Sequence, residues 1–167
     1  MTDQYSSRSL TIAAEQDTFT PVQIEALRSI GLQGAAPAEI QVFFHTCKRT
    51  GLDPFARQIY MINRQGNWTI QTGIDGFRLV AQRTTERTHG TLGYEDPLWC
   101  GPDGVWHDVW VADEPPVASK SVVVRNGERF PAVALFREYV GTRWDKKLGK
   151  KVPNTMWQEK PALMLQK

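Results

Sequence analysis

The sequence predicts a single α+β domain in which an antiparallel β-sheet packs with helices. Apolar residues recur at helical spacing in two segments before residue 51, and then alternate at strand spacing in short segments between 58 and 136. The dipeptide Asn126-Gly127, which is typical of a two-residue hairpin turn, lies between two of these segments. Helices followed by several neighbouring short strands, without repeated strand–helix–strand units, are typical of this fold class.

The domain is expected to span residues 18–167, after a polar N-terminal leader at residues 1–17 that we expect to be flexible. Its first helix should begin at Pro21, with Thr20 as the N-cap and Gln23 completing a capping box, and should end at Gly31. The inward-facing apolar residues of this helix would be Val22, Ala26, Leu27 and Ile30.

A second helix is expected from residue 37 to residue 50, with Gly51 as its end. Its inward residues follow helical spacing and are Ile40, Phe43, Phe44 and Cys47. The chain has two cysteines, Cys47 and Cys100, which is too few for a disulfide framework. No metal site is expected from either one.

Residues 58–62 and 67–71 alternate as strands, and Gln65-Gly66 between them predicts a hairpin. Asp75 is expected to cap a following helix, whose inward residues would be Phe77, Val80 and Ala81. Gly73 and Gly76 flank this junction, where a missing side chain permits close backbone packing. We therefore assign structural roles to Gly73, Asp75 and Gly76.

The later part of the chain is expected to hold four more strands, then a basic loop, then a last helix from Pro161. Because the chain stops at Lys167, this last helix is expected to be incomplete and the sequence to be truncated. The expected strands cover residues 91–94, 105–111, 120–125 and 129–136.

Charge is unevenly distributed around a formal net charge of +2. Residues 86–114 contain seven acidic and one basic residue, whereas residues 137–167 contain eight basic and three acidic ones. A basic segment with aromatic residues favours a single-stranded nucleic acid as partner, although a solvated loop is the alternative. Trp68 and Trp157 would either stack on bases or pack in the core, and both possibilities stay open.

The sequence lacks the motifs of several enzyme classes. No Gly-x-x-x-x-Gly-Lys-Ser/Thr loop is present to bind a nucleoside triphosphate. Asp103, Asp108 and Asp113 could in principle hold metal ions, so a metal-dependent nuclease remains an alternative, as does a non-catalytic interaction module. Without a signal peptide or a long apolar segment, no membrane association is expected and a cytoplasmic location is the default.

Three sequence blocks resemble the Bet branch of the RecT/Bet family of phage recombination proteins. The first is CKRTGLDPFARQIY at residues 47–60, and the second is GIDGFR at residues 73–78. The third is Met156-Trp157, followed by Pro161 and Met164-Leu165. The blocks keep the family's order and spacing over residues 36–167, and together they are specific. In one departure, Ala162 stands where some relatives have lysine.

The resemblance implies a protein that is not an enzyme and that binds and anneals single-stranded DNA without ATP. No cofactor is implied, although a divalent cation could assist annealing. The implied partners are single-stranded DNA, the annealed duplex, further copies of the chain in a ring or filament, and a phage 5′→3′ exonuclease in the bacterial cytoplasm. The resemblance implies that family members continue beyond the position of Lys167 with an Arg-x-Ala-Phe-like element and a C-terminal region for partner proteins, so filament formation and full-strength annealing are expected to need more than these 167 residues.

The expected DNA-binding residues come partly from the blocks and partly from the basic segment. Arginine and lysine contact phosphates without reading base sequence, which suits a protein that must anneal any strand. The blocks supply Arg57 and Arg78, and Arg64 lies near Trp68 in the sequence. The remaining expected DNA-binding residues are Lys146, Lys147, Lys150, Lys151, Trp157, Lys160 and Lys167.

Overall fold

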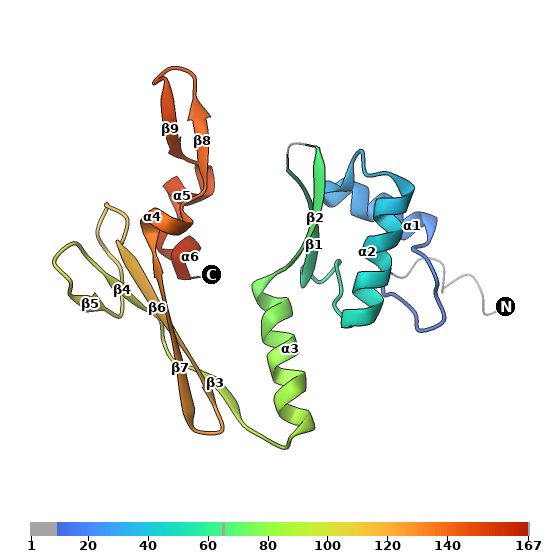
Figure 1. Ribbon diagram of the computed structural model, residues 1–167, viewed down its shortest axis with the longest axis horizontal. Helices are drawn as coiled ribbons and strands as arrows, with labels where there is room; N and C mark the ends of the chain where they lie inside the picture. The colour runs from blue at the N-terminus through green and yellow to red at the C-terminus, as the bar shows by residue number, and fades with distance from the viewer. Residues whose placement is uncertain (1–9, 65, 167) are drawn as a thin grey trace. The chain divides into compact units, whose positions relative to one another are not determined.

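The computed structural model describes residues 10–64 and 66–166, and its helices and antiparallel strands confirm the α+β class (Figure 1). Contacts within the chain divide it into two compact units, Met1–Ala81 and Gln82–Lys167, which we call unit 1 and unit 2. The division falls inside helix α3 (Ile74–Arg87). Unit 1 holds the two-stranded sheet of β1 and β2, and unit 2 holds a five-stranded and a second two-stranded sheet, and each unit has its own buried residues.

Helix α1 (Pro21–Leu27) begins with the predicted capping box. The Thr20 hydroxyl accepts a hydrogen bond from the Gln23 backbone, and the Gln23 side chain accepts one from the Thr20 backbone. The expected inward stripe is confirmed at Leu27, which is buried. It is wrong at Val22 and Ile30, which are exposed. Gln23 takes the inward position in the first turn, and the chain continues as a wider π-helical turn, η2 (Arg28–Leu32), which shifts the later side chains.

Helix α2 (Pro37–Thr50) confirms its predicted bounds, and Gly51 ends it in the left-handed conformation, with φ 65°. The four residues predicted to face inward are all buried. They join Phe19, whose ring lies 5.0 Å from that of Phe44 in an edge-to-face arrangement. Unit 1 is therefore built around the apolar face of α2.

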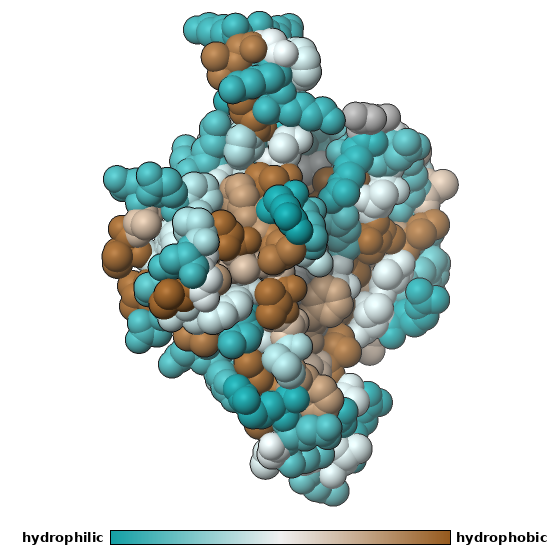
Figure 2. Space-filling view, turned by 60° about the vertical axis from the view of Figure 1, so that its left-hand side comes forward, coloured by the Kyte–Doolittle hydropathy of each residue, from teal (hydrophilic) through white to brown (hydrophobic). Residues whose placement is uncertain are grey.

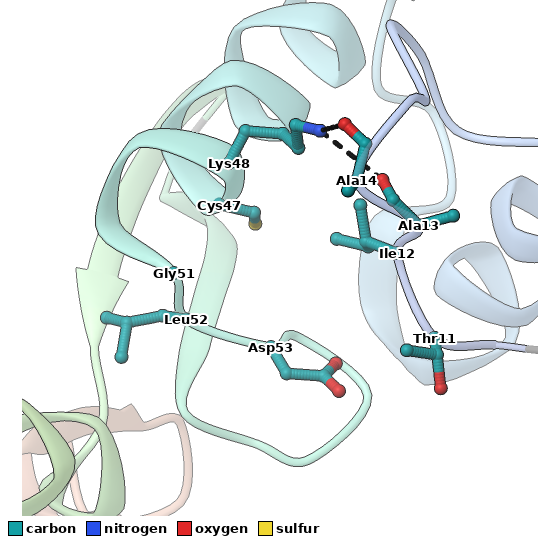
Figure 3. Close-up of a pocket in the computed structure, with 9 residues that line it drawn as sticks. All are labelled: Thr11, Ile12, Ala13, Ala14, Cys47, Lys48, Gly51, Leu52 and Asp53. Atoms are coloured by element: carbon teal, nitrogen blue, oxygen red, sulfur yellow. Dashed lines mark hydrogen bonds between the residues drawn. The ribbon is translucent and has the colours of Figure 1, made fainter.

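Residues 10–17, the described part of the N-terminal leader expected from the sequence, contact the rest of unit 1. Lys48 Nζ donates hydrogen bonds to the carbonyls of Ala13 and Ala14 (Figure 3), and Gln23 Nε2 donates one to Thr11. Ile12 packs against the core. The polar composition of this segment hid these backbone contacts, and residues 1–9 lie outside the described residues.

Strands β1 (Ile59–Arg64) and β2 (Asn67–Thr72) form the predicted hairpin, with Ile59 opposite Thr72 and Arg64 opposite Asn67. Gln65 of its turn lies outside the described residues. The buried side chains of the hairpin are Ile59 and Met61, so β1 turns this face toward the core.

Helix α3 differs from the sequence prediction in its start and in its inward face. It begins at Ile74, so Asp75 lies in the first turn and not at the cap position. Phe77 and Val80 are exposed, whereas Gly76 is buried and Leu79 packs partly against the core. The expected inward face was therefore wrong by about one residue, which is about 100° around a helix.

Unit 2 is built on a five-stranded antiparallel sheet in which the long strand β6 pairs with β3, β4 and β7. The hairpin predicted at Asn126-Gly127 is confirmed, and both residues have positive φ angles, of 52° and 80°. The strand predicted over residues 105–111 is confirmed only at Trp106–His107, which pair with the unpredicted strand β4, and the rest of that range is not a strand. The strands are β3 (Leu92–Tyr94), β4 (Leu98–Cys100), β5 (Trp106–His107), β6 (Ala118–Arg125) and β7 (Glu128–Leu135).

A short helix, an additional hairpin and two further helices complete unit 2. The last helix begins at Pro161, as predicted, and Trp99 of β4 donates a hydrogen bond from its indole nitrogen to the Ala162 carbonyl. The elements are α4 (Phe136–Tyr139), β8 (Thr142–Asp145), β9 (Lys150–Pro153), α5 (Thr155–Glu159) and α6 (Pro161–Gln166). Across the part of the chain that the structure describes, no helix is both long and apolar enough to cross a membrane.

Candidate nucleic-acid interface

The basic segment expected as a loop forms the hairpin of β8 and β9. Lys146 and Lys147 lie in its turn, while Lys150 and Lys151 begin β9. The Asp145 carboxylate closes the turn by accepting hydrogen bonds from the backbone N–H groups of Lys147, at 2.8 Å, and Leu148, at 3.1 Å. Side-chain bonding of this kind lets aspartate start a turn without the Asn-Gly pair that usually predicts a hairpin.

The hairpin carries five basic residues and one acidic residue, Asp145. The Asp145 carboxylate bonds within the turn and lies 3.9 Å from a guanidinium nitrogen of Arg143. Among residues 10–64 and 66–166, no carboxylate forms an ion pair with any of the four lysines. Their positive charges are therefore not neutralised within the described part of the protein.

The hairpin extends beyond the helices of its own unit, as Figure 1 shows for β8 and β9 relative to α4, α5 and α6. The same hairpin, at the top of Figure 2, has a mainly hydrophilic surface. All four of its lysines are exposed. Exposed ammonium groups can replace the counterions of a phosphate backbone, which is the main source of affinity for nucleic acids.

The strand register places different side chains on the two faces of the hairpin. Trp144 lies opposite Lys151, and Arg143 lies opposite Val152. Directly opposed residues of an antiparallel pair share one face. Val152 is buried and α5 packs on its strand, whereas Trp144 is 61% exposed. The face of Trp144 and Lys151 is therefore open to solvent.

Trp157 does not offer a surface to bases. It is buried, and its ring lies 5.5 Å from that of Phe136 in an edge-to-face arrangement. A side chain at Gly141 would come within 3.1 Å of its indole. The core alternative left open by the sequence is therefore the one that the structure shows. Of the two lysines expected near Trp157 to bind DNA, Lys160 is exposed and lies between α5 and α6. Lys167 lies outside the described residues.

The arginines expected from the sequence belong to unit 1 and are all exposed. Arg57 lies in the loop before β1 with a positive φ of 59°, Arg64 ends β1, and Arg78 lies in α3. Trp68 on β2 is half-buried and packs against the core, so its side chain serves the fold of unit 1.

The first two sequence blocks of the resemblance meet where the chain passes from β2 into α3. The Gly73 backbone donates a hydrogen bond of 2.9 Å to the Gln58 carbonyl. A Cβ atom at Gly73 would lie 2.9 Å from the Arg57 carbonyl oxygen, and one at Gly76 would lie 2.1 Å from that of Gln58. The two glycines therefore lie against the loop that presents Arg57. Asp75 stands between them as an exposed residue at the positive end of the α3 dipole.

The residues that could hold a metal ion do not gather in the described ranges. Neither residues 10–64 nor residues 66–166 contain a group of three or more His, Cys, Asp or Glu side chains arranged to bind one, so Asp103, Asp108 and Asp113 do not form such a group. Cys47 lines a pocket of about 360 Å³ beneath residues 11–14 (Figure 3). Burial, with a smaller effect of Asp53, raises the pKa of Cys47 to about 12, so the thiol stays protonated at neutral pH.

Comparison with protein families gives a match over nearly the whole chain. A sequence model of the RecT family matches residues 16–167. Comparison with curated proteins and with solved structures gave no match. The family match covers most of unit 1 and all of unit 2, with the two arginine-bearing blocks and the basic hairpin. The chain therefore belongs to the RecT family.

Proposed function

We propose that this protein binds single-stranded DNA and anneals complementary strands during phage recombination, as a member of the Bet branch of its family. The family match over residues 16–167 supports this proposal, as do the three sequence blocks. The structural observation that carries it is the projecting β8–β9 hairpin, on which four exposed lysines have no acidic partner among the described residues.

The arrangement of the hairpin suits annealing better than sequence-specific binding. Lysine ammonium groups contact phosphates as point charges and leave the hydrogen-bonding edges of the bases free. Two strands held in this way lose part of their mutual electrostatic repulsion while their bases remain able to pair. Arg57, Arg64 and Arg78 would add further phosphate contacts from unit 1.

The proposal includes no cofactor. Annealing would proceed without ATP, and a divalent cation could assist by screening phosphates. The further partners that we propose are the annealed duplex, other copies of this chain, and a phage 5′→3′ exonuclease that exposes the single strands in the bacterial cytoplasm. The protein would act as a binding protein and not as an enzyme.

The test is to change Lys146, Lys147, Lys150 and Lys151 together to alanine. Fluorescence anisotropy with labelled oligonucleotides of several unrelated sequences should show weaker binding for every sequence. Plots of log affinity against log salt should become shallower by about 0.7 for each phosphate that the variant no longer neutralises. Because these side chains are exposed, the free energy of unfolding should change by less than about 0.5 kcal/mol per substitution.

The matched control replaces the same four lysines by arginine, which keeps the charge and should keep both the affinity and the salt dependence. A folded alanine variant with the affinity and the salt slope of the wild type would show that the hairpin is only a solvated surface. The DNA-binding role would then depend on Arg57, Arg64 and Arg78.

A further inference from the structure

We propose that the open face of the β8–β9 hairpin is a binding site for one unpaired nucleotide, with the Trp144 indole stacked on the base and the Lys151 ammonium on a neighbouring phosphate. This inference rests on the proposed function and makes it more specific. It predicts that the hairpin distinguishes a single strand from a duplex. The four lysines alone would bind both forms, because both carry a phosphate backbone.

Trp144 differs from the five other tryptophans, each of which has a partner within the protein. Trp68 packs against the core, Trp99 donates to the Ala162 carbonyl, and Trp110 donates to the Glu114 carbonyl. Lys120 Nζ lies 4.6 Å from the ring centre of Trp106, and Trp157 packs on Phe136.

Trp144 has no such role in the fold. In the ranges that the structure describes, no hydrogen bond or ring contact involves its indole, and the residue is 61% exposed. A large, flat and exposed side chain on a projecting hairpin is available to an external planar group.

The position of Lys151 indicates what kind of planar group fits. Trp144 and Lys151 are directly opposed across the hairpin, on the face away from the buried Val152. An aromatic ring beside a cation matches a nucleotide, which offers a π-face and a phosphate within one residue of the chain. A paired base in a duplex is already stacked on both sides, so it cannot use the indole. Annealing would therefore release the base from Trp144.

The hairpin contains a matched control for each of these two residues. Leu148 lies in the turn and is 62% exposed, so it has the same exposure as Trp144 without an aromatic ring. Lys150 is adjacent to Lys151 on β9 and has the same charge, but it shares the opposite face with Asp145. A general effect of hydrophobicity or charge would appear in the controls as strongly as in the proposed site.

The experiment measures the affinity of the 167-residue protein for three probes of equal length. They are oligo-dT, an abasic sugar–phosphate strand and a duplex. Trp144→Ala should weaken oligo-dT binding by roughly 5- to 150-fold and leave binding of the abasic strand unchanged. Trp144→Phe should keep most of the preference for oligo-dT, whereas Leu148→Ala should keep all of it.

A second comparison tests Lys151 through its coupling to Trp144. Lys151→Ala should lower affinity for oligo-dT further than Lys150→Ala, and its effect should shrink in the Trp144→Ala background. The effect of Lys150→Ala should be the same in both backgrounds.

Failure of the inference and failure of the proposed function give different results. If the wild type does not bind oligo-dT, both are overturned. If the wild type binds oligo-dT and Trp144→Ala keeps the wild-type ratio of oligo-dT to abasic affinity, only the nucleotide site is overturned. If Trp144→Ala lowers the melting temperature, Trp144→Leu is compared with Trp144→Phe instead. An equal ratio of oligo-dT to abasic affinity in these two variants would also overturn the nucleotide site.

Discussion

At the scale of the residue, the best-defined feature is the absence of a side chain at Gly76. A Cβ atom there would lie 2.1 Å from the Gln58 carbonyl oxygen and 2.8 Å from the Thr72 methyl carbon. The first of these neighbours is backbone immediately before β1, whose first residue is buried, and it cannot move away alone. Gly76→Ala should therefore lower the free energy of unfolding by about 1–3 kcal/mol or more.

Chemical denaturation measures this effect, and Gly93→Ala in β3 is the matched control. Gly93 has open space where a Cβ atom would stand, so this variant should unfold within about 0.5 kcal/mol of the wild type. Equal stability of the Gly76 and Gly93 variants would mean that the backbone at Gln58 moves away easily. The close packing of the two sequence blocks would then contribute little to the free energy of unfolding.

Cys47 provides a second test at this scale. Burial, with a smaller effect of Asp53, raises its pKa from an ordinary value of 9.0 to about 12. Since the thiolate is the reactive form, a Cys100→Ser variant should react slowly with iodoacetamide at pH 8 when folded and quickly in guanidinium. Because the folded state holds the Cys47 proton more tightly than the unfolded state does, Cys47 contributes to the stability of the fold below pH 9. This contribution to the free energy of unfolding is lost as the pH rises toward about 12. Rapid labelling of the folded variant would contradict the burial.

At the scale of the element, the sequence predicted those elements whose signals are local. The Thr20–Gln23 capping box, the end of α2 at Gly51 and the Asn126-Gly127 turn each depend on the chemistry of a few adjacent residues. Strand β4 was not predicted, and β5 is much shorter than the strand predicted over residues 105–111, because elements of three and two residues carry too short a pattern. The pairing of β4 depends on β6, which follows it beyond β5 and a loop, and β5 pairs with β4.

The candidate site shows the same division between local and long-range information. The sequence indicated that residues 143–151 are basic, and it could not indicate which tryptophan near them is exposed. Trp157 has helical neighbours and an Asn154 cap, and it packs on Phe136 from another element. Trp144 became the candidate only through the register of β8 and β9. Burial of an aromatic side chain is decided by tertiary partners that no local pattern reveals.

At the scale of the whole molecule, the net charge of +2 conceals a separation of charge within unit 2. Acidic residues predominate from 86 to 114 and basic ones from 137 to 167. The total charge alone would not predict binding to DNA, whereas the local charge of the hairpin does. Salt dependence should therefore follow the hairpin lysines and not the overall charge.

The last prediction concerns the reaction of the whole protein. Two complementary strands labelled as a fluorescence donor and acceptor should anneal faster with the protein than without it, in the absence of any nucleotide. The sequence contains no Gly-x-x-x-x-Gly-Lys-Ser/Thr motif, and neutralised phosphates need no chemical energy to come together. The four-alanine hairpin variant should accelerate annealing less than the wild type does, and a non-complementary strand should give no signal.

The same reaction also tests for cleavage of the strands. EDTA should leave strand length unchanged on a denaturing gel, as should added magnesium. A strict need for ATP would overturn the assignment of an annealing protein. Magnesium-dependent shortening of the strands, lost in an Asp103→Asn, Asp108→Asn variant, would instead support the metal-dependent nuclease.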